Sequence, residues 1–189
     1  MENKLFLKEY LEDFKALIST DNNLISDLNH FSDLLKEVHS NGKKAIIVGN
    51  GGSAAIASHF SVDLTKNAGV RCINFNESDL ITCFANDYGF DNWVFRAVEF
   101  YGDKGDLFIG ISSSGNSLDI INGCNSAKQK SFSKIVTFSG FDENNPLKMC
   151  GDLNFWVDSK AYNFVENIHQ LWLLSIVDLI IGKTEYSAS

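Results

Sequence analysis

The 189-residue chain lacks any excess of positive charge. It contains 16 Lys and Arg against 24 Asp and Glu, and its formal net charge is −8. Binding to nucleic acid or to an anionic membrane needs clustered Lys and Arg side chains, and the sequence contains no such cluster. We therefore expect neither a nucleic-acid partner nor a membrane partner, and a small molecule is the favoured ligand.

Paired cysteines and long apolar runs are also missing. The four cysteines, at positions 72, 83, 124 and 150, form no C-x-x-C pair, which is typical of buried free thiols in a reducing compartment. The chain begins Met-Glu-Asn-Lys, without an apolar signal core, and the apolar run 171–181 is too short to cross a bilayer. These features predict a cytoplasmic protein.

No linker or low-complexity tract divides the chain, so we expect one domain over residues 1–189. Apolar side chains at helical spacing predict an amphipathic helical hairpin over 1–40, with Asp21 and Asn22 ending one helix and capping the next. An α/β core is expected over 41–189. Its predicted strands are 45–48, 70–75, 107–111, 135–139 and 154–157, and its predicted helices are 54–66, 77–85, 93–101, 117–130 and 161–181. This alternation indicates a parallel sheet covered by helices on both faces.

A glycine-rich loop follows the first predicted strand. Asn50, Gly51, Gly52 and Ser53 separate that strand from a helix, so backbone N–H groups and the positive end of the helix dipole point at one place. This arrangement predicts an anion site, most often for phosphate. Gly49, Gly51 and Ala54 also match the dinucleotide pattern G-x-G-x-x-A, but the acidic residue expected about 20 positions later would be Glu77, which does not end a clean strand. We expect no nucleotide cofactor.

A serine-rich loop repeats the same design after the third predicted strand. The run Ser112-Ser113-Ser114-Gly115-Asn116-Ser117 precedes a helical pattern. Serine hydroxyls and backbone N–H groups can bind phosphate oxygens together, at roughly 1.5–3 kcal/mol for each bond to a charged acceptor. The two loops together are expected to hold one phosphate ester without Lys or Arg.

The two loops, with Asn86-Asp87-Tyr88-Gly89 between them as a polar turn, resemble the sugar isomerase (SIS) domain family, and within it the phosphoheptose isomerases. The resemblance implies a three-layer α/β sandwich of flavodoxin-like type with a five-stranded parallel sheet. It also implies a homotetramer with active sites between subunits. The implied activity converts sedoheptulose 7-phosphate to a heptose 7-phosphate aldose, for surface-polysaccharide heptose synthesis.

The resemblance also implies a set of substrate contacts, with the phosphate on the serine loop. We add Asn116, within that loop, and His169, which follows Glu166 by three residues on the last helix. The candidate substrate-binding residues are Asn50, Gly51, Gly52, Ser53, Asn86, Asp87, Ser112, Ser113, Ser114, Asn116, Ser117 and His169.

Aldose–ketose isomerisation needs a base that moves a proton between C1 and C2 through an enediol. His59 and Asp63 are four residues apart on one helix face, so they could form a metal pair or a base with its orienting partner. They could equally be an interior histidine and a solvated charge. We take Asp63, Glu166 and His59 as candidate catalytic residues and, with one nitrogen and two carboxylates, as a possible Zn²⁺ site.

Three positions depart from the pattern that the resemblance implies. Asp63 stands where a glutamate is expected, Glu166 where a glutamine is expected, and Leu174 where a second histidine is expected. A leucine can neither bind metal nor transfer a proton. The sequence thus favours a phosphosugar isomerase, with a non-catalytic phosphosugar sensor or adaptor of the same fold as the alternative.

Overall fold

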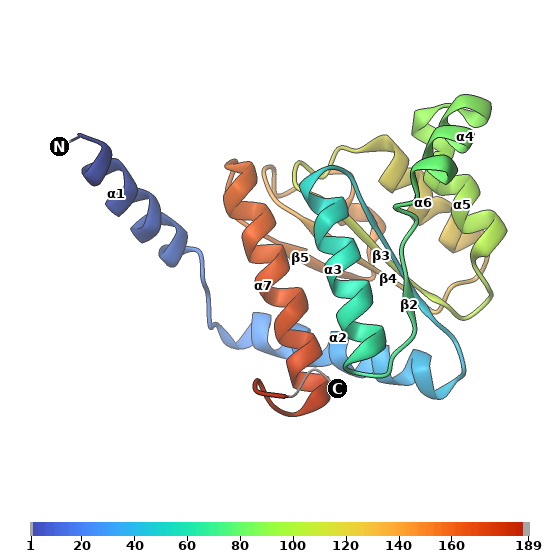
Figure 1. Ribbon diagram of the computed structural model, residues 1–189, viewed down its shortest axis with the longest axis horizontal. Helices are drawn as coiled ribbons and strands as arrows, with labels where there is room; N and C mark the ends of the chain where they lie inside the picture. Colours follow the sequence, from blue (N-terminus) through green and yellow to red (C-terminus); the bar gives the residue numbers. More distant parts are fainter. Residues whose placement is uncertain (1, 187–189) are drawn as a thin grey trace.

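A five-stranded parallel sheet lies at the centre of the structure (Figure 1). The computed structural model describes residues 2–186. The strands lie in the order β2-β1-β3-β4-β5, and each neighbouring pair is parallel. They are β1 (Ala45–Gly49), β2 (Cys72–Ile73), β3 (Leu107–Ser112), β4 (Lys134–Ser139) and β5 (Leu153–Trp156). The predicted sheet is confirmed, although β2 is shorter than the expected run 70–75.

Helices cover both faces of this sheet, which confirms the predicted three-layer sandwich. One apolar cluster joins the sheet to α2, α3 and α7, and a second joins the opposite face to α5 and α6. The helices are α1 (Glu2–Ala16), α2 (Asn22–Ser40), α3 (Gly52–Lys66), α4 (Ser78–Tyr88), α5 (Trp93–Tyr101), α6 (Leu118–Gln129) and α7 (Tyr162–Ile181), with 3₁₀ turns η1 (Phe90–Asn92) and η2 (Lys148–Cys150). Strands β1 and β3 are buried along their whole length, as their continuous apolar runs indicate.

The two N-terminal helices form where predicted, and the Asp21 side chain caps α2 by accepting from the backbone N–H groups of Asn23 and Leu24. In Figure 1, α1 extends away from the sheet. Its contacts with the rest of the chain include Tyr10 and Phe14, whose rings lie 4.6 and 5.7 Å from the ring of Phe164 on α7. The apolar residues Leu5, Phe6, Leu7 and Leu11 remain exposed. This surface is available to a partner.

Three local expectations need correction or comment. Asn86, Asp87 and Tyr88 form the last turn of α4 rather than a turn of their own, because the helix continues until Gly89, at a φ of +82°. The thiols are free, but only Cys72 and Cys124 are buried, and Cys83 is exposed.

Helix α7 is long and apolar enough to span a membrane by composition, yet its Val165, Ile168, Trp172 and other side chains are buried in the protein core.

Helices α5 and α6 pack closely at Gly123. A Cβ added there would lie 2.5 Å from Val94 Cγ1 and 2.9 Å from Phe108 Cζ. Alanine is the better helix former by about 1 kcal/mol, whereas overpacking a core costs about 1–3 kcal/mol. We expect Gly123→Ala to lower the free energy of unfolding, measured by urea denaturation. In a Val94→Ala background the same change should be less costly; a stabilised single variant would contradict the close packing.

The ring of His169 is fully buried on α7, and its Nε2 lies 3.1 Å from the backbone oxygen of Ser139 at the end of β4. Because a carbonyl only accepts, Nε2 carries the proton and donates. Burial lowers the pKa of His169 to about 4, against the opposing effect of the hydrogen bond to Ser139. This histidine therefore stays neutral and fastens α7 to the sheet.

The His169 pKa has a consequence for stability. An unfolded histidine titrates near pH 6.5, so between about pH 6.5 and 4 the unfolded chain binds the extra proton. Stability should therefore fall as pH falls through this window, by about 3 kcal/mol in total. His169→Gln, which keeps a donor, should flatten the dependence of unfolding free energy on pH, whereas His30→Gln at an exposed position should not. Identical slopes in wild type and His169→Gln would contradict the burial argument.

Candidate functional site

The loops after β1 and β3 meet in a small cavity at the carboxyl edge of the sheet. They meet because β1 and β3 are parallel neighbours in register, with Gly49 opposite Ile111. The start of α7 closes a third side. The cavity has a volume of about 130 Å³ and is lined by Asn50, Ser53, Ile111, Ser112, Ser113, Ser114, Ser117, Tyr162 and Glu166. The two loops that the sequence singles out therefore contribute to one hollow.

The serine loop (residues 112–117) is held in place from both sides. Its Ser112 and Ser117 hydroxyls lie 2.9 Å apart, so they share one hydrogen bond. Gly115 has a φ of +70°, which favours glycine, and an added Cβ there would overlap the Asn145 side chain. The Leu147 N–H donates to the Gly115 oxygen over 3.0 Å. The segment after β4 thus fixes the loop from behind.

The serine loop leads directly into α6. This helix begins at Leu118, and Ser117 provides no side-chain cap to its first N–H groups. The helix dipole favours an anion here, and within the first turn the Asp119 carboxylate already accepts a hydrogen bond from the Ile120 backbone. With hydroxyls from Ser112, Ser113, Ser114 and Ser117 around the same cavity, this side of the cavity has the donors that a phosphate group needs.

The glycine loop faces one of the protein's own carboxylates. A Cβ added to Gly52 would overlap the Glu166 carboxylate, so this carboxylate packs against the first residue of α3. A negative side chain is favourable at a helix N-terminus. Both helix starts have a carboxylate, Glu166 at α3 and Asp119 in the first turn of α6. The serine hydroxyls, which only the α6 side provides, are what favour a phosphate at the serine loop, and Glu166 lies at the other side of the hollow. That both loops hold one phosphate ester stays a prediction.

A buried carboxylate that the sequence does not single out lies behind Asn50. The Asn50 Nδ2 is 3.0 and 2.9 Å from the two oxygens of Asp119, and the Trp93 Nε1 donates to Asp119 Oδ2 over 3.1 Å. Asp119 is 2% exposed. Burial raises its pKa, while hydrogen bonds from Asn50, the Ile120 backbone and Trp93 act in the opposite direction. The only feature of the sequence that could have indicated a role for Asp119 is its place in the first turn of α6.

His59 and Asp63 lie further along α3 and do not line the cavity. The His59 Nε2 is 3.3 Å from the Asp63 Oδ2, and their side chains are 49% and 25% exposed. Among residues 2–186, no three His, Cys, Asp or Glu side chains are grouped so that they could hold a metal ion. His59, Asp63 and Glu166 therefore do not form such a group within one chain, and the zinc site stays a prediction.

Other candidate residues also lie outside the cavity. Asn86 and Asp87 are exposed on α4 and bond to each other over 2.9 Å. Asn116 bonds the Ser114 oxygen over 2.9 Å and so supports the serine loop from its exposed side. Gly51 is exposed at the N-cap of α3. The prediction that His169 contacts substrate conflicts with its complete burial. Tyr162, which the sequence analysis missed, does line the cavity.

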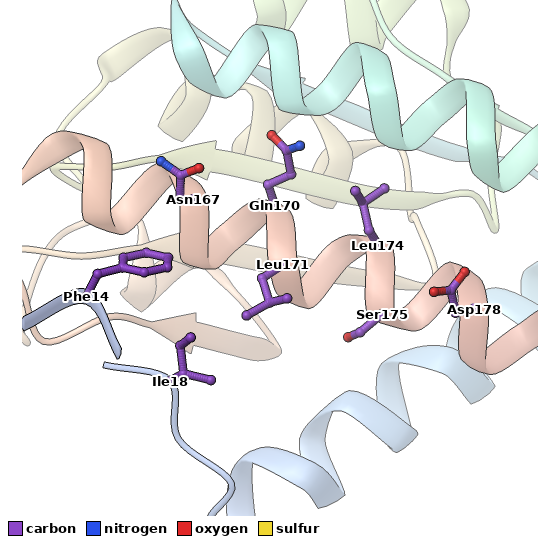
Figure 2. A pocket seen from close by; sticks show the side chains of 8 residues that line it. All are labelled: Phe14, Ile18, Asn167, Gln170, Leu171, Leu174, Ser175 and Asp178. Carbon is purple, nitrogen blue, oxygen red and sulfur yellow. The ribbon is translucent and has the colours of Figure 1, made fainter. Parts of the chain in front are cut away.

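Leu174 lies in an apolar groove along α7 (Figure 2). Figure 2 shows Gln170 and Leu174 projecting toward α3, while Phe14 and Ile18 from the N-terminal segment border the other side. The groove has a volume of about 440 Å³ and is also lined by Asn167, Leu171, Ser175 and Asp178. No histidine is among the residues that line this groove.

Comparison with known proteins supports the family assignment from sequence. Residues 9–139 match the SIS domain family. The phosphoheptose isomerase of Sulfurimonas denitrificans is 35% identical over 186 residues, covering 94% of both chains. The phosphoheptose isomerase of Fusobacterium nucleatum is 37% identical over 149 residues, covering 76% of both chains.

Solved structures agree with this result. The phosphoheptose isomerase from Francisella tularensis matches with a TM-score of 0.88 at 25% identity, covering 97% of this chain and all (100%) of that one. The enzyme from Neisseria gonorrhoeae matches with a TM-score of 0.85 at 25% identity, covering 95% and 99%. The Vibrio vulnificus NanR protein, complexed with ManNAc-6P, shares the fold alone, with a TM-score of 0.66 at 15% identity and coverage of 91% and 58%.

The sequence similarity to these isomerases extends over nearly the whole chain. It agrees with the two loops, with their order along the chain and with the sheet that brings them together. The chain belongs to the phosphoheptose isomerase family of SIS-domain proteins.

Proposed function

We propose that the protein is an aldose–ketose isomerase that interconverts sedoheptulose 7-phosphate and a heptose 7-phosphate aldose for surface-polysaccharide heptose synthesis. The single observation that carries this proposal is the cavity in which a serine loop and the Glu166 carboxylate face each other. A phosphate donor set on one side and a base on the other are what the reaction requires. Family membership supplies the choice of a heptose.

The cavity accommodates only part of such a substrate. Clefts for small molecules typically have about 300–1,000 Å³, whereas this hollow has about 130 Å³. The phosphate end therefore binds among Ser112, Ser113, Ser114 and Ser117, and the rest of the sugar extends past Glu166 and Ser53. Fixing the phosphate at one end holds the reacting carbons at a set distance from the carboxylate.

Proton transfer needs no oxidant or reductant. From the ketose, the base removes a proton at C1 as the C1–C2 double bond forms and the C2 oxygen takes a proton. The resulting enediol loses the proton of its C1 hydroxyl as C2 takes the proton from the base, leaving an aldehyde at C1. Glu166 lines the cavity and Asp63 does not, so Glu166 is the base. Ser53 also lines the cavity and is the donor that stabilises the enediol oxygens.

This assignment separates two carboxylates that the sequence leaves equivalent. We expect Glu166→Gln to slow exchange of substrate C–H protons with D₂O at least about 100-fold, followed by NMR with sedoheptulose 7-phosphate. Asp63→Asn, which alters only the pair with His59, should retain most of the exchange and serves as the matched control. Loss of exchange in Asp63→Asn with full exchange in Glu166→Gln would reverse the assignment.

A second candidate function is a phosphosugar-binding sensor or adaptor without catalysis. Leu174 favours it, because a leucine in an apolar groove replaces the histidine that the family resemblance implies. The same experiment separates the two functions. Binding of sedoheptulose 7-phosphate without any proton exchange in the wild-type protein would favour the sensor, whereas exchange dependent on Glu166 would favour the enzyme.

We propose further that the protein is a cytoplasmic homotetramer, as the family resemblance implies. Leu5, Phe6, Leu7 and Leu11 on α1 are each more than half exposed. Leu7 and Leu11, four residues apart, lie on one face of the helix, and a second copy would cover this apolar surface. Light scattering after gel filtration should give the mass of four chains, and Leu11→Glu should lower it. A monomeric wild-type protein would contradict this proposal.

A further inference from the structure

The Asn50–Asp119–Trp93 contact determines which atom of the Asn50 amide can meet a ligand. Asp119 does not itself line the cavity, whereas Asn50 does. We propose that Asp119 is a positioning residue that turns the Asn50 amide oxygen toward the sugar, so that the site selects a hydroxyl donor at this point. The identity of the sugar rests on the proposed function, whereas the orientation of the amide does not.

The donors around Asp119 determine this orientation. Asn50 Nδ2 lies 3.0 and 2.9 Å from the two carboxylate oxygens, and Trp93 donates to one of them over 3.1 Å. An ionised carboxylate only accepts hydrogen bonds, so the Asn50 nitrogen has to face it. Among residues 2–186, no hydrogen bond is made to Asn50 Oδ1. That oxygen is left to accept from a ligand.

Because Trp93 donates to Asp119, the orientation of the Asn50 amide depends on which atoms the side chain at position 119 carries. The indole N–H only donates, and Trp93 is 1% exposed, so the atom it meets at position 119 has to be an acceptor. In an Asp119→Asn variant, the carboxamide oxygen would stay with Trp93 and the new NH₂ group would face Asn50. The Asn50 amide would then lose its fixed orientation, because its NH₂ group would still meet an oxygen at the Oδ2 position but would oppose the new NH₂ group at the Oδ1 position.

An Asn50 amide that is free to turn its NH₂ group toward the cavity should change ligand preference in two directions. A sugar hydroxyl would lose its acceptor, whereas a phosphate oxygen would gain a donor. We expect Asp119→Asn to weaken sedoheptulose 7-phosphate about tenfold and to leave inorganic phosphate unchanged or bound more tightly, both measured by calorimetry on the intact protein. Asp106→Asn is the matched control, because Asp106 is equally buried but lies at the opposite end of β3, bonded to Lys44.

The outcomes distinguish positioning from a merely structural role. Equal weakening of both ligands in Asp119→Asn, or no change in either, would overturn the inference. The Asn50 side-chain NH₂ signal in a ¹⁵N-correlated NMR spectrum tests the amide directly without ligand: it should shift in Asp119→Asn and not in Asp106→Asn, and an unmoved signal would overturn the inference. If wild type binds phosphate but not sedoheptulose 7-phosphate, the proposed substrate is wrong, while a shifted Asn50 signal would still support the amide orientation.

Discussion

Parallel pairing of β1 with β3 is the interaction on which the site depends. The two strands are central, fully buried and in register, so the chain leaves both at the same edge of the sheet. Each strand then opens into a loop of small residues followed by a helix. Because the apolar strands cannot slip by one residue without exposing their buried side chains, the distance between the glycine loop and the serine loop is fixed by the core.

Charge is divided across the resulting hollow. On one side, α6 begins without a side-chain cap and is surrounded by serine hydroxyls. On the other, the start of α3 is already matched by the Glu166 carboxylate, which lies so close to Gly52 that a Cβ added there would displace it. The serine hydroxyls therefore favour a dianion on the first side, and the Glu166 charge disfavours one on the second. The same separation keeps the carboxylate beside the sugar carbons, where a base is useful.

The sequence predicts the fold and many of the residues around the cavity. It does not predict the features that depend on how elements distant in the sequence pack together. Continuous apolar runs and helical periodicity predict the sheet and its layers, and the two similar loops predict most of the residues that line the cavity. The burial of His169 could not be predicted, because it depends on how α7 lies against Ser139 at the end of β4. Nor could the ranking of Glu166 above Asp63, since both follow helical patterns and only the contact of α7 with Gly52 separates them. In the sequence, Asp119 is an acidic residue of a kind common in the first turn of helices. Only the structure shows that Asn50 and Trp93 donate hydrogen bonds to it.

The central claim is that the phosphate of the sugar binds at the serine loop and the reacting carbons lie beside Glu166. The most direct test is a crystal structure of the protein with sedoheptulose 7-phosphate. The phosphate should lie among the hydroxyls of Ser112, Ser113, Ser114 and Ser117, with C1 and C2 within reach of the Glu166 carboxylate. A phosphate bound at the start of α3, or at the hollow beside β2 lined by Thr65 and Lys66, would contradict the account.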